Sequence, residues 1–336
     1  MINTIYFNRY SYDPFIDYIK GISIIFVILN HCIGESLHSK SIYCLWGDSA
    51  VPLFLIIQTF HAYKKGLDVR FSISKIWRRV FKNFILMQLV LVAILAVKDD
   101  GGIVHTIGEW FSQGGFGSGS YYVWIYLQFA ILFPLCAIFI KKLHGWQLFL
   151  FFIVVCHLFE FLFSVWNISS SLYRLICIRY FFLIYLGYMI VKEEGVIMDL
   201  KKLLLSLLSA VAIIILYYGN MDFRPIFFTN VSYSWRIFHW ISYFYAAYFF
   251  ILALNTIHKR ARPQFNSTIE YLGKYSYEIF LFQMFYFALA QYGTIPFLNG
   301  FDHNYSRIIY IIISSTICIA TVPCFNIIKG KLSVKD

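Results

Sequence analysis

Long apolar runs recur along almost the whole chain, and they limit its possible folds more than any other feature. Of the 336 residues, 60% are hydrophobic and 13% are charged, a balance that is not typical of a soluble domain. A helix crosses a bilayer with about 20 mostly apolar residues. We therefore predict an all-α, polytopic transmembrane protein with about ten spans. The predicted spans are residues 15–33, 43–63, 80–97, 121–140, 146–166, 172–191, 203–218, 233–257, 275–292 and 307–328.

Lysine and arginine residues gather in alternate connections between the predicted spans. The rich set is Lys64, Lys65, Arg70, Lys75, Arg78, Arg79, Lys82, Lys141, Lys142, Lys192, Lys201, Lys202, Lys259, Arg260 and Arg262, and the opposite set is Lys40, Lys98 and Arg224. Because cytoplasmic loops are enriched in these residues, we predict that both termini lie in the cytoplasm. The net charge of +11 then indicates membrane topology rather than nucleic-acid binding. We expect one membrane domain, residues 1–336, without a cleaved signal peptide.

The seven cysteines lie mostly inside apolar runs. They show neither a Cys-x-x-Cys motif nor a Cys/His spacing typical of a metal site. We interpret them as packing residues and expect no metal.

The first predicted span carries three ionisable residues on one helix face. Asp17 and Lys20 lie near its start, and His31 follows Lys20 by eleven positions. At about 100° per residue, this separation returns His31 to the face of Lys20, roughly 16 Å further along the axis. Ionisable groups inside a membrane are costly and usually have a function. His31 is therefore either a hydrogen-bonded core histidine or a general base that removes a hydroxyl proton.

Three cations adjoin the start of the third predicted span: Arg78, Arg79 and Lys82. One interpretation is that they only set the membrane topology. The other is that their helical spacing directs two of them toward one anion, as in a binding site for phosphate groups.

A second group of ionisable residues lies toward the outer half of the fifth and sixth predicted spans. His157 and Glu160 are one turn apart, and Arg174 and Arg179 follow in the next span. They either form a buried ion pair that tethers neighbouring helices or line an outward-facing cavity for a polar acceptor. Weaker acceptor candidates near the outer end of the eighth span are Trp235, Arg236 and His239.

Together with these residues, six short motifs in the right order resemble the acyltransferase-3 family of integral membrane proteins. The matching segments are 15–31 (with Asp, Lys, ten residues and His), 50–54, 79–82, 122–126 with 133–134, 179–187 and 272–281. Three positions depart from the family pattern. Lys82 replaces a second arginine, Gln58-Thr59 a frequent Ser-Gly, and Gln283 a frequent His. A lysine keeps the charge but loses the forked geometry of arginine.

The resemblance implies an O-acyltransferase that uses cytoplasmic acyl-coenzyme A, usually acetyl-coenzyme A, as its donor. The phosphates of the donor would meet Arg78, Arg79 and Lys82, and its long arm would follow the polar face from Lys20 inward. His31 would either take the proton of the acceptor hydroxyl or carry the acyl group transiently. Both mechanisms agree with the sequence.

The acceptor implied by the resemblance is a hydroxyl of an extracytoplasmic or lipid-linked saccharide. Asp17 would orient Lys20 through an ion pair. The residues expected to bind the acceptor are Arg174, Arg179, Glu160 and His157. The expected location is the bacterial cytoplasmic (inner) membrane, as a multi-pass protein.

Two other functional classes compete with the enzyme. A transporter or exporter of a lipid-linked or polymeric glycan would use the intramembrane cations as substrate contacts and would bind no coenzyme A. The chain lacks the paired broken helices in two corresponding halves that mark a repeat-built transporter. A scaffold in polysaccharide assembly would leave the shared face of Lys20 and His31 unexplained. The sequence therefore favours the enzyme.

Overall fold

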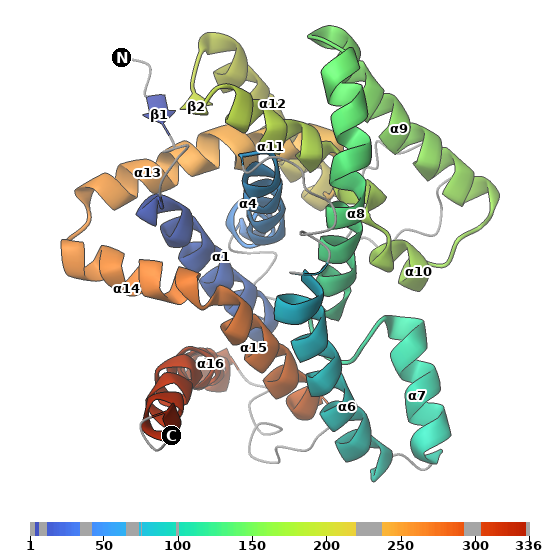
Figure 1. The fold of residues 1–336 in the computed structure, drawn as a ribbon, viewed down its shortest axis with the longest axis vertical. Helices are drawn as coiled ribbons and strands as arrows, with labels where there is room; N and C mark the ends of the chain where they lie inside the picture. The colour runs from blue at the N-terminus through green and yellow to red at the C-terminus, as the bar shows by residue number, and fades with distance from the viewer. Residues whose placement is uncertain are drawn as a thin grey trace.

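A computed structural model describes the chain at residues 4–6, 12–33, 42–64, 74, 76–98, 101–219, 237–291 and 304–333, and it is almost entirely helical (Figure 1). Each of the ten predicted spans contains a helix. The main helices of these spans are α1 (Pro14–Cys32), α4 (Ala50–Lys64), α6 (Lys82–Ala96), α8 (Ser120–Lys142), α9 (Trp146–Val165), α11 (Phe182–Lys192), α12 (Leu200–Tyr218), α13 (Ile251–Arg260), α15 (Ser276–Gln291) and α16 (Asn304–Ser333).

Further helices extend or connect these main helices. They are α3 (Tyr43–Trp46), α7 (Gly102–Gln113), α10 (Ser170–Leu175), α14 (Pro263–Lys274), the π-helices η1 (Trp77–Phe81) and η5 (Tyr245–Phe250), and the 3₁₀ helices η2 (Cys177–Tyr180) and η4 (Trp240–Ser242). The sixth predicted span is consequently not one helix. The extended backbone of Ile176, with φ −97° and ψ 135°, separates α10 from η2, and η2 continues through Phe181 into α11.

Within the described ranges, seven helical segments are long and apolar enough to cross a membrane. They are Pro14–Cys32, Tyr43–Lys64, Trp77–Ala96, Ser120–Lys142, Trp146–Val165, Leu200–Tyr218 and Trp240–Arg260. A shorter apolar segment is Arg307–Thr321. The structure thus agrees with a polytopic helical membrane protein. The number of ten spans and the cytoplasmic location of the termini stay predictions.

The structure agrees with the predicted all-α fold, and one small sheet accompanies the helices. Strand β1 (Thr4–Tyr6) pairs with strand β2 (Gly195–Ile197) in a two-stranded antiparallel sheet, with Thr4 opposite Ile197. Glu194 and Gly195, with φ 55° and φ 152°, turn the chain out of α11 into β2. Hydropathy could not predict this sheet, because its three-residue strands are nearly 190 positions apart and lie outside the apolar runs.

Two amphipathic helices, α7 and α14, were not predicted from the sequence. Helix α7 packs against α6, and α14 packs along α1 after the chain turns back at the end of α13 (Figure 1). In α14 the buried residues are Ile269, Leu272 and Gly273. Its other face is polar, so α14 falls below the hydropathy of a membrane span even though it covers one.

Helix α1 lies in the middle of this arrangement and packs against α4, α14, α15 and α16. Its start is specified locally, because Pro14 occupies the first turn and the Asp13 side chain accepts a hydrogen bond from the Phe15 amide at 3.0 Å. The faces of α1 that meet its neighbours are buried, and its ionisable residues therefore depend on those neighbours for polar surroundings.

Glycines allow α1 and α14 to approach each other closely. A Cβ atom on Gly273 would lie 1.7 Å from the backbone oxygen of Asp17, and one on Gly21 would lie 2.0 Å from the backbone oxygen of Ile269. Backbone atoms cannot move aside as the end of a side chain can. Small residues at these two positions are therefore a condition of the observed packing, as is common between membrane helices.

We predict that Gly273→Ala destabilises the protein by about 1–3 kcal/mol, because the added methyl group forces α14 away from α1. The matched control is Gly108→Ala in α7, where an added Cβ would meet no atom within 4 Å. Thermal unfolding of the purified protein in detergent checks this. Equal melting temperatures for the two variants would contradict the close packing of α1 and α14.

A candidate active-site cavity along helix α1

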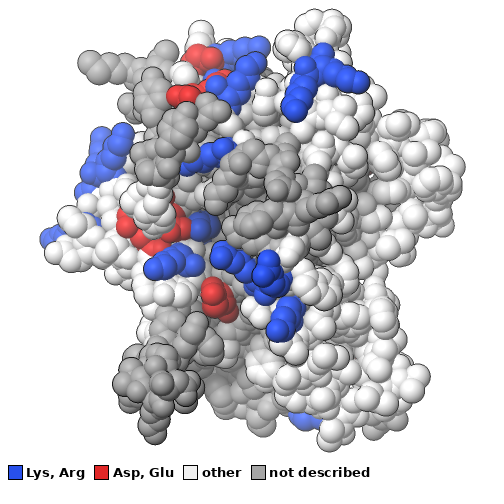
Figure 2. Space-filling view, in the orientation of Figure 1, with Lys and Arg blue, Asp and Glu red and all other residues white. Residues whose placement is uncertain are grey.

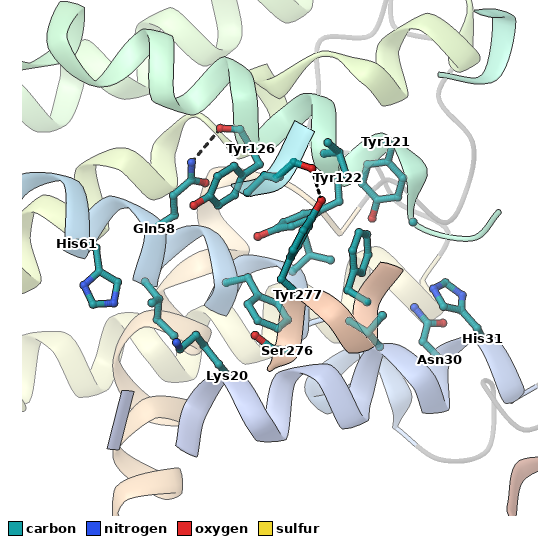
Figure 3. Close-up of a pocket in the computed structure, with 18 residues that line it drawn as sticks. Lys20, Asn30, His31, Gln58, His61, Tyr121, Tyr122, Tyr126, Ser276 and Tyr277 are labelled. Carbon is teal, nitrogen blue, oxygen red and sulfur yellow. Dashed lines mark hydrogen bonds between the residues drawn. The ribbon is translucent and has the colours of Figure 1, made fainter. Parts of the chain in front are cut away.

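A cavity of about 240 Å³ lies between α1, α4, α8 and α15, with contributions from Val80 of η1 and from Gly119. Most of its wall is apolar. The polar residues that line it are Lys20, Asn30, His31, Gln58, His61, Tyr121, Tyr122, Tyr126, Ser276 and Tyr277 (Figure 3). Water-accessible space of this kind removes the main cost of placing ionisable residues within an apolar helix.

The polar residues of the cavity are distributed along its length (Figure 3). Lys20 and His61 lie at one end, and Asn30, His31 and Tyr121 lie at the other. The axial rise of α1 separates the two ends by roughly 16 Å. The prediction that Lys20 and His31 share one helix face is confirmed, because both residues line the same cavity.

The His31 ring lies in the last turn of α1 and is half-buried. Its ring packs edge-on against Phe287 of α15, with the ring centroids 5.6 Å apart and the planes at 62°. This contact holds the imidazole against the wall while the cavity remains in front of it. Asn30, the preceding residue, lines the same end.

At the other end, Lys20 forms the predicted ion pair with Asp17. The Tyr12 hydroxyl donates a hydrogen bond of 2.6 Å to the second carboxylate oxygen of Asp17. This hydrogen bond and the negative charge of Asp17 raise the pKa of Tyr12 to about 12. Asp17 is buried, whereas the side chain of Lys20 is 24% exposed. Asp17 thus positions Lys20 from outside the cavity and does not line it.

The cations predicted to bind phosphate flank Val80, a residue of the cavity wall. Arg78, Arg79 and Lys82 are all exposed, and Val80 between them lines the cavity. The Tyr277 hydroxyl donates a hydrogen bond of 2.5 Å to the Val80 carbonyl oxygen and so fixes η1 to α15. Figure 2 shows a group of Lys and Arg side chains on this part of the surface. A ligand in the cavity could therefore place an anionic end among these cations.

The four residues predicted to bind the acceptor do not line this cavity. His157 and Glu160 instead approach His239, and their ligand-type atoms lie within 4.8 Å of one another. The Trp240 indole donates a hydrogen bond of 3.0 Å to Nε2 of His157. Since an indole N–H can only donate, Nε2 is the unprotonated nitrogen, and the neutral ring carries its proton on Nδ1, which faces Glu160. A protonated Nδ1 offers no lone pair to a metal at this position.

Arg179 lies directly behind the cavity wall. Its guanidinium is buried and packs on aromatic rings, with its central carbon 5.0 Å from the ring of Tyr121 and 4.8 Å from that of Tyr180. It donates a hydrogen bond to the Arg174 carbonyl oxygen, and Arg174 donates to that of Gln113, at 2.9 and 2.6 Å. Arg179 therefore contacts the back of Tyr121, a residue of the cavity wall. Trp235 and Arg236 lie outside the described residues.

Several polar residues of the cavity were given no role by the sequence analysis. Asn30 and His61 are isolated polar residues in apolar runs, a pattern that could have singled them out, whereas Gln58 was already noted as a departure from the family pattern. The tyrosines and Ser276 could not be found in this way, because Tyr is common at both membrane interfaces and in apolar cores. Only the packing of α8 against α4 and α15 shows which tyrosines meet.

A glycine-rich loop closes the cavity at the start of α8. Gly117 and Gly119 have φ values of +87° and +92°, a region that other residues rarely adopt. The buried side chain of Gln88 holds this loop, since it accepts a hydrogen bond from the Phe116 amide at 2.8 Å and donates one to the Phe116 carbonyl oxygen at 2.9 Å. Gly119 lines the cavity.

The fold and the cavity define an integral membrane protein with an internal site that combines two histidines, a lysine and an adjacent basic surface. Comparison with protein families indicates which reaction such a membrane protein catalyses. The family model described as "Acyltransferase domain" matches residues 13–325, nearly the whole chain. The chain therefore belongs to the acyltransferase-3 family and is a membrane acyltransferase. The comparisons with curated proteins and with solved structures each found no match.

We predict that Ser276→Cys is modified by a water-soluble methanethiosulfonate reagent, because Ser276 lines the cavity. The control is Ser23→Cys on the first helix, where the native side chain is fully buried and does not line the cavity. Mass spectrometry, with the unsubstituted protein as background, measures the added label. A cavity closed to water would leave both cysteines unmodified.

Proposed function

We propose that the protein is an O-acyltransferase, most specifically an O-acetyltransferase, that moves the acyl group of cytoplasmic acyl-coenzyme A to a hydroxyl of an extracytoplasmic or lipid-linked saccharide. The observation that carries this proposal is the cavity that joins Lys20 and the neighbourhood of Arg79 to His31. An acyl donor needs such a path, because its anionic end must stay at the surface while its thioester reaches the reacting groups.

The donor lies along α1 in this proposal. The phosphates of coenzyme A bind at Arg78, Arg79 and Lys82, whose exposed side chains can pair with them. The arm of the donor passes Lys20, held by Asp17, and extends roughly 16 Å to His31. The apolar and tyrosine-rich wall suits a flexible chain of methylene and amide groups.

The acyl transfer takes place at His31. The imidazole removes the proton of the acceptor hydroxyl as its oxygen attacks the thioester carbonyl carbon. The new C–O bond forms, the C–S bond breaks, and coenzyme A leaves as a thiolate that takes the proton from the imidazolium. Atoms and charge balance without a metal or a redox partner. Phe287 keeps the ring oriented through both proton transfers.

The acceptor enters from the His31 end in this proposal. Tyr121 lines that end and rests on Arg179, whose hydrogen bonds continue to Arg174. Arg174 and Arg179 thus support the wall that meets the acceptor, while His157 and Glu160 lie further out with His239. With the basic connections on the inner side, the protein lies in the bacterial cytoplasmic membrane.

Membership of an acyltransferase family favours this enzyme over a glycan transporter or a scaffold. The cavity adds a physical reason. Lys20 and His31 lie at opposite ends of it, which suits a donor that is anchored at one end and reacts at the other. Export of a glycan does not require a lysine and a histidine at opposite ends of one cavity.

We expect His31→Ala to lower acetyl transfer in isolated membranes by about 10²- to 10⁴-fold, the usual contribution of a general base. Transfer is measured with radiolabelled acetyl-coenzyme A and surface-glycan acceptor. The control is His144→Ala, an exposed histidine outside the cavity, which should retain full activity. Normal transfer by correctly inserted His31→Ala would refute the role of His31.

Arg79→Ala should raise the KM for acetyl-coenzyme A by about ten- to a hundredfold, because a charge-assisted contact to phosphate is lost. The same variant should use S-acetylpantetheine, which lacks the phosphates, as well as the unsubstituted protein does. Initial rates with both donors separate these effects. Equal losses with the two donors would show that Arg79 acts on the fold and not on the phosphates.

A further inference from the structure

Asn30 is a polar residue of the cavity to which the proposed mechanism gives no role. It follows the apolar residues Ile28 and Leu29 in α1 and lies next to His31, at the end of the cavity opposite Lys20 (Figure 3). Within the part of the chain that the structure describes, its side-chain amide forms no hydrogen bond. A polar side chain in an apolar membrane helix costs free energy unless it finds a partner. No described contact with the protein compensates for this cost.

The amide of Asn30 is accessible from the cavity. The residue is only partly buried, and neither atom of its amide is enclosed by protein. Because no hydrogen bond holds the amide, it can turn either its nitrogen or its oxygen toward a molecule in the cavity. Asn30 can therefore offer N–H donors to a bound ligand.

Asn30 and His31 approach one end of the cavity from different directions. They are consecutive residues of a helix, so their side chains leave the helix axis about 100° apart. Both nevertheless line the cavity at the same end. A reacting group between them meets the imidazole on one side and the amide on the other. An acyl transfer needs such a pair, because a base must meet the attacking hydroxyl while a separate donor meets the carbonyl oxygen.

The ends of two helices add favourable charge at the same place. His31 lies in the last turn of α1, where the partly negative carbonyl groups of the helix end favour a positive imidazolium. Gly119 and Tyr121 line the cavity at the start of α8, where the partly positive amide groups of the helix end favour negative charge. These are the charges that form when His31 takes a proton and the carbonyl oxygen becomes negative.

We propose that Asn30 donates an amide N–H hydrogen bond to the carbonyl oxygen of the acyl donor and stabilises the negative charge that this oxygen gains during transfer. This inference rests on the proposed function and gives its reaction a second catalytic residue. As the acceptor oxygen bonds to the carbonyl carbon, an electron pair of the C=O bond moves onto the carbonyl oxygen. The pair returns when the C–S bond breaks. Asn30 itself neither gains nor loses a proton.

The first test separates kcat from KM. We expect Asn30→Ala to lower kcat for transfer from acetyl-coenzyme A to the surface-glycan acceptor by about 10²- to 10³-fold, the usual cost of removing one donor to an oxyanion. The KM for acetyl-coenzyme A should stay nearly unchanged, because the hydrogen bond strengthens only as the charge forms. Asn30→Leu should behave in the same way, and its apolar side chain suits a membrane helix if the smaller alanine impairs folding.

The second test changes the carbonyl oxygen itself. In the dithioester analogue of acetyl-coenzyme A, sulfur replaces this oxygen and accepts hydrogen bonds only weakly. We expect the replacement to lower kcat of the unsubstituted protein about tenfold more than kcat of Asn30→Ala, since only the unsubstituted protein has the hydrogen bond to lose. A purely structural role of Asn30 would leave the two effects equal.

The matched control is Asn255→Ala. This variant removes the same amide group from a buried position of α13 that does not line the cavity. It should retain the kcat of the unsubstituted protein and the same ratio between the thioester and the dithioester.

Three results overturn the proposal. If kcat of Asn30→Ala or Asn30→Leu equals that of the unsubstituted protein, the amide does not stabilise the transition state. A raised KM with an unchanged kcat shows that Asn30 binds the donor without acting on the developing charge. An equal effect of the dithioester on both proteins shows that Asn30 does not meet the carbonyl oxygen. Absence of transfer by the unsubstituted protein refutes the proposed function, whereas transfer without an effect of Asn30 refutes only this inference.

Discussion

Ionisable side chains in an apolar membrane helix cost free energy unless polar surroundings are available, and the structure around helix α1 depends on meeting this requirement. Helix α1 carries Lys20 near one end and His31 near the other, and both need polar surroundings that lipid cannot supply. The cavity meets this need, since α4, α8 and α15 enclose space along one face of α1 and contribute amide and hydroxyl groups to it. The cavity forms because α4, α8 and α15 leave space beside this face of α1, whereas α14 packs closely against α1.

Close packing on the opposite side of α1 keeps this arrangement in place. Gly21 and Gly273 bring the backbones of α1 and α14 together, so α1 cannot move into the cavity space without losing that contact. On the cavity side, the Tyr277 hydroxyl ties the carbonyl oxygen of Val80 to α15 and holds the basic turn of η1 at the mouth.

Two kinds of feature could be predicted from the sequence: those that follow from the hydropathy of apolar runs and those that follow from the 3.6-residue period of the α-helix. Every predicted span contains a helix, and the spacing of Lys20 and His31 correctly placed both on one cavity. The sequence could not predict α14, which is too polar to resemble a span, or the pairing of β1 with β2. The outer residues also differed from expectation, because whether Arg179 lines a cavity or supports Tyr121 depends on packing between distant segments.

The most direct test of the central claim is a cryo-electron microscopy structure with a thioether analogue of acetyl-coenzyme A, which cannot transfer its acyl group. We expect density for the arm between α1, α4, α8 and α15, with the phosphates at Arg79 and the thioether sulfur beside His31. An analogue bound elsewhere, or lipid filling the cavity with His31 turned toward the bilayer, would contradict it.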